Sequence, residues 1–123
     1  ETERSWKINE ETDMSKKIER VDGQWNKTDG TSLKGHLTAS YAEIVSVLGQ
    51  PTHPVEKIDA HWSFEVNGEV VVTLYNWKNG RVYNGPKAPP VEKLKSWNIG
   101  GHDSKAVKAV SELFPTSNVY SSN

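Results

Sequence analysis

Four histidines are the first residues to consider for chemistry, because imidazole and carboxylate groups are the usual ligands of zinc and iron. His36, His53, His61 and His102 are scattered along the chain, and two of them have an aspartate within two residues. No pair has the HxH, HxxxH or HExxH spacing that places two ligands on one face of an element. The sequence therefore predicts no metal site and no cofactor.

Serine-based catalysis is the second option, with Ser40 or Ser104 as nucleophile and His102 and Asp103 as its partners. Residues adjacent in sequence rarely align as nucleophile, base and orienting acid, and the chain has no G-x-S-x-G elbow. Both serines also stand where a helix N-cap is expected. The chain has no cysteine, which excludes a thiolate nucleophile and disulfides. We therefore predict no catalytic residue and a protein that binds rather than an enzyme.

Gly100 and Gly101, followed by His102, precede a predicted helix. A glycine pair in that position exposes backbone N–H groups to an anion such as phosphate, and the helix dipole adds to the attraction. Asp103 would repel that anion while capping the helix. Two interpretations stay open: an anion site formed by these three residues, or a tight turn from strand to helix.

The segment 76–97 combines cations with flat rings. It carries five basic residues against the single acid Glu92, a net charge of +4, interleaved with aromatic residues. Such a loop can hold a nucleotide, an oligonucleotide or an acidic protein surface by ion pairing and stacking. The predicted ligand-binding residues of this loop are Lys78, Arg81, Tyr83 and Lys87. Trp77 and Trp97 are expected in the core with Trp62.

The length and composition of the chain predict its domain organisation. The chain of 123 residues has the length of one domain, a net charge of -1 and no apolar run near the roughly 20 residues that cross a bilayer. Fifteen of the first 35 residues are charged, against 16 of the other 88. We predict a polar N-terminal arm over 1–30 that is partly ordered or docks, a globular domain over 31–114 and a flexible tail over 115–123.

Two alternatives describe the end of the arm. Met14, Ile18, Val21 and Trp25 have the spacing of a helix face, whereas Asp22-Gly23 is typical of a two-residue hairpin turn between strands. The sequence does not decide between them.

The predicted domain is α+β, a two-layer sandwich of order β-α-β-β-β-α. Its largely antiparallel sheet has four strands, and two short helices cover one face. Ser40 and Glu43 form a capping box before the first helix. The strands are expected at 35–39, 61–66, 69–77 and 96–99, and the helices at 41–48 and from 104 to 114.

Asn67-Gly68 predicts a tight hairpin between the second and third strands. A two-residue loop would place Phe64 opposite Val71 and leave the apolar side chains of Val70, Val72 and Leu74 on the face away from Trp62. That face would need a cover. We predict an interface there, in which Trp6 and Trp25 of the arm cover these residues within one chain or across a homo-oligomer.

The sequence resembles a group of small uncharacterised proteins of tailed phages and large DNA viruses. The likeness covers roughly residues 31–113, and its most specific part is Tyr-Asn-Trp-Lys at 75–78 with Trp-Asn-Ile-Gly-Gly at 97–101. A looser similarity links Leu-Gly-Gln-Pro at 48–51 and the strand that follows to β-lactamase-inhibitor-like proteins, which are binding proteins. The first resemblance implies a viral protein and no reaction.

Together these features predict a non-enzymatic phage protein that acts in the host cytoplasm. It would occupy a host protein or sequester a small anionic ligand, and so antagonise host defence. The alternative is a nucleotide or nucleic-acid binding module that uses the loop 76–97. No membrane partner is expected.

Overall fold

The computed structural model describes residues 17–122. It is an α+β fold built on one antiparallel sheet. In chain order, the elements are β1 (Ile18–Arg20), α2 (Trp25–Thr28), β2 (Ser32–Thr38), α3 (Tyr41–Leu48), β3 (His61–Val66), β4 (Val70–Tyr75), α4 (Arg81–Asn84), the 3-10 turn η1 (Val91–Lys93), β5 (Ser96–Gly101), α5 (Lys105–Leu113) and β6 (Asn118–Ser121).

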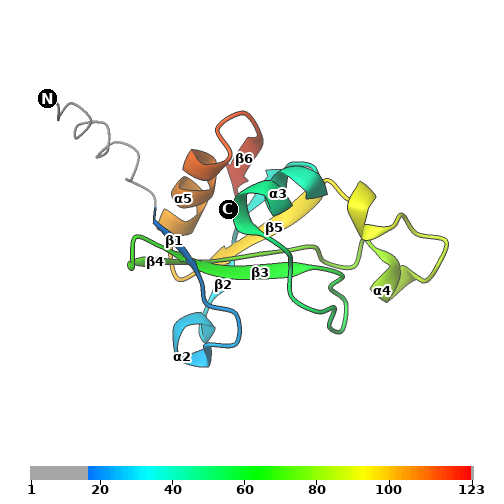
Figure 1. The fold of residues 1–123 in the computed structure, drawn as a ribbon, viewed down its shortest axis with the longest axis horizontal. Coiled ribbons are helices and arrows are strands. Elements are labelled where there is room, and N and C mark those ends of the chain that lie inside the picture. The colour runs from blue at the N-terminus through cyan, green and yellow to red at the C-terminus, as the bar shows by residue number, and fades with distance from the viewer. Residues whose placement is uncertain (1–16, 123) are drawn as a thin grey trace, which may run out of the picture.

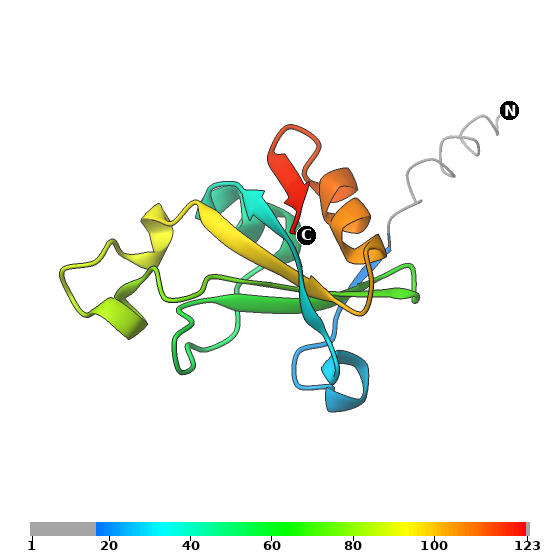
Figure 2. The same ribbon diagram turned by 180° about the vertical axis from the view of Figure 1, so that it is seen from behind.

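The sheet has the strand order β1-β3-β4-β5-β2-β6, and every neighbouring pair is antiparallel. The helices α3 and α5 lie on one face, while α2 lies beyond the other face and α4 extends from one end of the sheet (Figures 1 and 2). The α+β class and the antiparallel sheet are confirmed. The prediction of four strands is wrong, because β1 and β6 extend the sheet to six within the described residues.

Local sequence explains the two longer helices. The backbone N–H of Glu43 donates to the Ser40 hydroxyl at 3.1 Å, which satisfies one free donor at the start of α3. The helix ends at Gly49, whose φ of 88° is accessible to glycine at little cost. In α5, Ala106, Ala109 and Val110 form the buried stripe that packs on the sheet.

Large aromatic side chains fill the core between the sheet and these helices. Trp62 and Trp97 are buried and meet edge to face, with ring centroids 5.5 Å apart. Their indole N–H groups donate to the carbonyls of Gly49 and Ala39. Trp77 differs from the prediction, because it follows the end of β4 and is 47% exposed.

The hairpin between β3 and β4 has the predicted turn but a different register. Asn67 and Gly68 both have positive φ, and the N–H of Glu69 donates to Val66 O at 3.0 Å. The ladder nevertheless pairs Val66 with Val70 and Phe64 with Val72, so Glu69 is one extra residue, as in a β-bulge. This single residue moves every side chain of β4 to the opposite face from the one predicted.

The corrected register removes the reason for an interface on β4. Val70, Val72 and Leu74 share a face with Trp62 and pack in the core beneath the helices, where Val72 and Leu74 are fully buried. Trp25 lies on the other side of the sheet, and Trp6 lies outside the described residues. The cover predicted for these three residues is thus supplied by the chain's own core.

Both chain ends also differ from their predictions. Ile18–Arg20 pairs with β3, and Asp22-Gly23 forms a turn that leads into α2, so neither the continuous helix nor the local hairpin is formed over the described residues. Met14 lies outside them. At the other end, Asn118–Ser121 pairs with β2 instead of fraying. Across residues 17–122, no helix is long and apolar enough to cross a membrane.

Candidate ligand-binding groove

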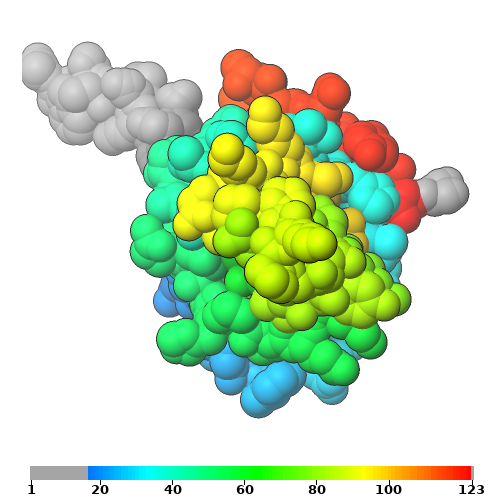
Figure 3. Space-filling model, turned by 90° about the vertical axis from the view of Figure 1, so that its right-hand side faces the viewer, coloured from blue at the N-terminus to red at the C-terminus, as the bar shows by residue number. Residues whose placement is uncertain are grey.

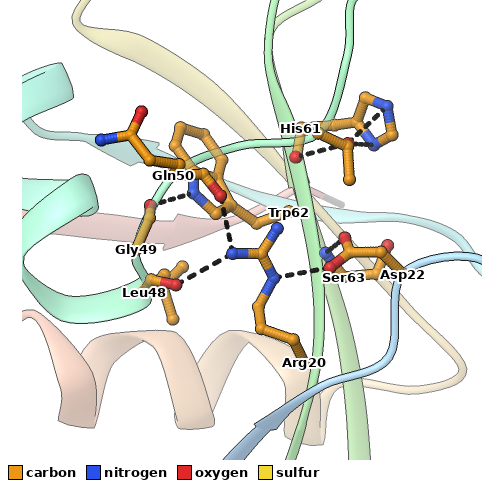
Figure 4. A network of polar contacts seen from close by, with 9 residues as sticks. Arg20, Asp22, Leu48, Gly49, Gln50, His61, Trp62 and Ser63 are labelled. Atoms are coloured by element: carbon orange, nitrogen blue, oxygen red, sulfur yellow. Dashed lines mark hydrogen bonds and ion pairs between the residues drawn. The ribbon is translucent and has the colours of Figure 1, made fainter.

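A network around Arg20 fixes the segment that leads into α2 (Figure 4). The guanidinium of Arg20 donates to the carbonyls of Leu48 and Gln50 at 2.9 and 2.8 Å, and it pairs with Asp22 at 2.6 Å. These carbonyls lie at the C-terminus of α3, where a cation is favoured by the helix dipole. The other oxygen of Asp22 accepts the backbone N–H of Ser63 at 2.8 Å. Strand β1 is therefore tied to both α3 and β3.

An open groove of about 600 Å³ lies on the face of the sheet away from α3 and α5. Its floor consists of alternate residues of the three central strands: His61 and Ser63 from β3, Thr73 and Tyr75 from β4, and Gly100 from β5. Gly100 keeps this floor open, because an added Cβ would clash with the hydroxyl oxygen of Thr73. The groove depends on the observed register, which brings Thr73 and Tyr75 to the side of His61 and Ser63.

Helix α2 forms one wall of the groove through Trp25 and Thr28. Two contacts hold this short helix beneath the sheet. Lys27 pairs with the buried carboxylate of Glu65 at 3.0 Å, and Nε2 of His102 lies 2.8 Å from the Lys27 carbonyl. Trp25 itself is 76% exposed. A ring that is fixed by its backbone and left uncovered by residues 17–122 is available to a ligand.

The loop between α3 and β3 forms the opposite wall with Thr52, Val55 and Ile58, and Trp77 closes that end. Asn76 attaches this loop to the end of β4. Its side-chain carbonyl accepts the N–H groups of Asp59 and Ala60 at 2.8 and 3.1 Å, and the amide is almost fully buried. The wall is therefore fixed by a satisfied buried polar group.

The interior of the groove is close to neutral. Asp22 is the only lining residue with a formal charge among those described, and Arg20 balances it. Burial lowers the pKa of His61 below 6.5; Asp22 opposes this shift and Arg20 adds to it. Burial also raises the pKa of Tyr75 above 10.0, against a smaller opposing effect of its hydrogen bond with Asn98. At neutral pH the imidazole and the phenol are both uncharged.

Asp22, His61 and Ser63 are the residue types of a hydrolase triad, but they are not connected as one in the described structure. The Thr52 hydroxyl lies 2.8 Å from both ring nitrogens of His61, a position over the ring and along neither lone pair. That hydroxyl also donates to the His61 carbonyl at 2.9 Å. Asp22 is used by Arg20 and the Ser63 N–H. Among residues 17–122, no hydroxyl in the groove is aligned with a histidine lone pair as a nucleophile is with its base.

Ser63 supplies the strongest sign that something binds. The residue is 9% exposed and lines the groove, yet its hydroxyl makes no hydrogen bond to any residue in the range 17–122. A hydroxyl that lines an open groove and is not used by the protein can bind water or the polar edge of a ligand. The nearby Thr73 hydroxyl likewise has no hydrogen-bond partner within this range. A ligand with polar edges would satisfy both groups.

The structure brings together only part of the predicted ligand site. Gly100 lines the groove, and Lys78 stacks on Tyr83 at 5.2 Å beside Trp77. Arg81 instead donates to the Ala88 carbonyl within the segment 78–90, which contains α4, and Lys87 is exposed in the same segment. This segment covers much of one end of the molecule, as the yellow-green atoms in Figure 3 show.

The structure places Gly100 and Gly101 within the sheet, and His102 directly after it. Both glycines belong to β5, which pairs with β4 on one side and β2 on the other, so their backbone groups serve the sheet. They are needed for close packing: an added Cβ on Gly101 would clash with Ala106 of α5. Asp103 accepts the N–H of Lys105 at 2.9 Å in the tight turn between β5 and α5.

The sequence did contain a signal for the missed floor residues. His61, Ser63 and Glu65 alternate with buried aromatic residues along β3, which marks a polar face. Thr73 and Tyr75 would have joined that face under the correct register. The extra residue Glu69 hid this, since a bulge has no reliable sequence pattern.

Within residues 17–122, no three His, Asp or Glu side chains gather in a way that could hold a metal ion. No protein-family model, curated protein or solved structure matches the chain. The function is therefore inferred from the geometry and chemistry of the groove.

Proposed function

We propose that this chain is a non-enzymatic binding protein that holds a small ligand with a flat ring in the groove beneath its sheet. The observation that carries this proposal is an open groove flanked by Trp25 and Trp77, into which Ser63 and Thr73 bring hydroxyls that make no hydrogen bond within residues 17–122. Flat rings stack on such residues, and hydroxyl groups fix their orientation through the polar edges.

The dimensions favour a small molecule over a protein surface. A volume of about 600 Å³ lies within the usual range for small-molecule pockets. The lining is mostly apolar, and apart from Asp22, which is paired with Arg20, its few polar groups are hydroxyls, an imidazole and a phenol. These groups donate and accept hydrogen bonds but carry no charge, so the enclosed part of the ligand is uncharged and polar at its edges.

The viral setting comes from the sequence resemblance alone, and we carry it into the proposal. In that setting the protein sequesters a host small molecule in the host cytoplasm. Capture of a small molecule requires no catalytic pair, in agreement with the arrangement of Thr52 and His61.

A fragment titration followed by ¹H–¹⁵N NMR tests the proposal. The probes are uncharged heteroaromatic molecules, including indole, quinoline, caffeine and adenosine. We expect saturable shifts of the amides of Ser63, Thr73 and Gly100 and of the indole N–H signals of Trp25 and Trp77. Shifts confined to other parts of the chain, or none with any fragment, would show that the groove is not a ring site.

Variants sharpen this test. Trp25→Ala removes the aromatic ring from one wall of the groove. Because this side chain is 76% exposed, the fold should tolerate the change. The matched control is Tyr120→Ala, which removes a 56% exposed ring at the far edge of the sheet. Fragment affinity should fall about 5- to 150-fold in the first variant, because a stacked ring contributes about 1–3 kcal/mol, and stay unchanged in the second. Equal affinity in both variants would contradict the proposed wall.

A further inference from the structure

Two lysines converge on the tryptophan at the end of the groove. The ammonium groups of Lys57 and Lys78 lie 5.7 and 5.8 Å from the centre of the Trp77 ring. Trp77 lines the groove, whereas neither lysine does. Two positive charges therefore lie around the Trp77 ring, just outside a neutral interior.

The backbone holds this pair in an unusual way. Lys57 and Lys78 have φ values of 114° and 60°, a region that L-residues with side chains seldom adopt, and the N–H of Lys78 donates to the Lys57 carbonyl at 3.0 Å. Over residues 17–122, the one other residue with a side chain and positive φ is Asn67 in the hairpin turn. Lys57 is the second central residue of a tight turn that Val55 and Ile58 close with two hydrogen bonds, whereas Lys78 lies in no such turn. Strained residues of this kind persist where surrounding structure enforces them, and they concentrate at functional sites.

The enforcing structure is the scaffold around Asn76. The Asn76 side chain binds the Asp59 backbone N–H and the Asp59 carboxylate, the latter at 2.9 Å. The same carboxylate accepts the N–H of Val82 and packs against Gly80, where an added Cβ would clash with it. These contacts hold the two loop segments that carry the lysines together in the absence of a ligand.

Nearby acids leave the pair largely uncompensated. Glu56 is 4.0 Å from the Lys57 ammonium at its closest, and its side chain is 86% exposed, so water and salt screen the contact. The Asp59 carboxylate is occupied by Asn76 and Val82. Lys78 makes ring contacts with Trp77 and Tyr83, which leave its N–H donors free to bind an anion.

We propose that Lys57 and Lys78 bind an anionic group of the ligand whose ring occupies the groove. This inference rests on the proposed function and names its ligand class: a heteroaromatic ring that carries a phosphate, as in a nucleoside monophosphate. The ring lies over the uncharged floor, and the phosphate lies at the Trp77 end. The two parts match a neutral interior beside a cationic margin.

Calorimetric titration of the full chain with nucleosides and their 5′-monophosphates tests this assignment, with inorganic phosphate as a third probe. We expect at least one monophosphate to bind about tenfold tighter than its nucleoside at low salt, with a difference that shrinks as salt rises. Lys57→Met and Lys78→Met should each remove most of that difference and leave nucleoside affinity unchanged. Lys95→Met is the matched control, an exposed lysine that follows η1, and it should change neither affinity.

Lys78→Gly guards against misfolding, because glycine accepts the φ of 60° without strain while removing the charge. It should fold and still lose the preference for the monophosphate. Equal affinity for nucleoside and monophosphate, or an unchanged preference in Lys78→Gly, would overturn the anion site. If uncharged fragments bind the groove but no nucleotide does, the ligand class is wrong and the proposed function stands. If phosphate binds at the lysines while no ring enters the groove, both proposals are wrong.

Discussion

Arg20 should contribute more to stability than its partial exposure suggests. Its side chain is 29% exposed, yet it donates to two carbonyls at the end of α3 and to Asp22. Hydrogen bonds involving a charged group contribute about 1.5–3 kcal/mol each when buried, and exposed ion pairs about 0.2–1 kcal/mol. Because water can replace part of these bonds, we expect Arg20→Met to lower the free energy of unfolding by about 2–3 kcal/mol.

The assay is denaturant unfolding, with thermal melting as a second readout. For a domain of this size the loss corresponds to a fall in Tm of about 8–12 °C. Methionine keeps the apolar stem of the side chain, so the measured change reports on the guanidinium. Lys95→Met again serves as control and should change the free energy of unfolding by less than about 0.5 kcal/mol.

A second consequence separates the network from a general loss of packing. Arg20 lowers the pKa of His61, so its removal should raise that pKa, which NMR titration of the imidazole can measure. Amide exchange in α2 should also accelerate, because Arg20 and Asp22 tie β1 to α3 and β3. If Arg20→Met is as stable as the control and the pKa of His61 is unchanged, the reasoning about this network is refuted.

Three further predictions concern other parts of the structure. Burial lowers the pKa of His61 below 6.5, so the unfolded chain binds a proton at this imidazole more readily than the folded chain does. The contribution of His61 to the free energy of unfolding should therefore be complete above pH 6.5 and fall as the pH drops below it. Urea titrations across this pH range should show that His61→Gln removes this contribution. Gly68→Val should lower the free energy of unfolding by about 1–2 kcal/mol, because the φ of 67° is costly for a β-branched residue, and an unchanged melting temperature would contradict the turn. Lys27→Met should cost about 1–2 kcal/mol by leaving the buried Glu65 carboxylate unpaired, and adding Glu65→Gln should recover part of this in denaturant unfolding; no recovery would argue against the pair.

Local signals in the sequence predicted the elements well. Ser40 capped α3, Gly49 ended it, and the apolar stripe of α5 lay on the sheet, since each feature depends on neighbours in the chain. The short strands β1 and β6 were missed because three and four residues in polar surroundings carry little periodicity. They exist because β3 and β2 each offer an edge on which to pair.

The groove could not be predicted from the sequence for a related reason. Its floor depends on the register between β3 and β4, which the single residue Glu69 shifts, and its wall depends on α2 being held by Lys27 and Glu65, 38 positions apart. The sequence points to the loop 76–97 because of its cations and rings, but Lys57 joins Lys78 only through the folded chain. Contacts between distant segments leave no pattern in one sequence.

The most direct test of the account is to locate a bound ring by intermolecular NOEs. A heteroaromatic ligand in the groove should show NOEs from its ring protons to the Thr73 methyl group and to the rings of both Trp25 and Trp77. NOEs to residues over the helical face instead, such as Val47 of α3, would contradict the claim that the face of the sheet away from the helices holds the ligand.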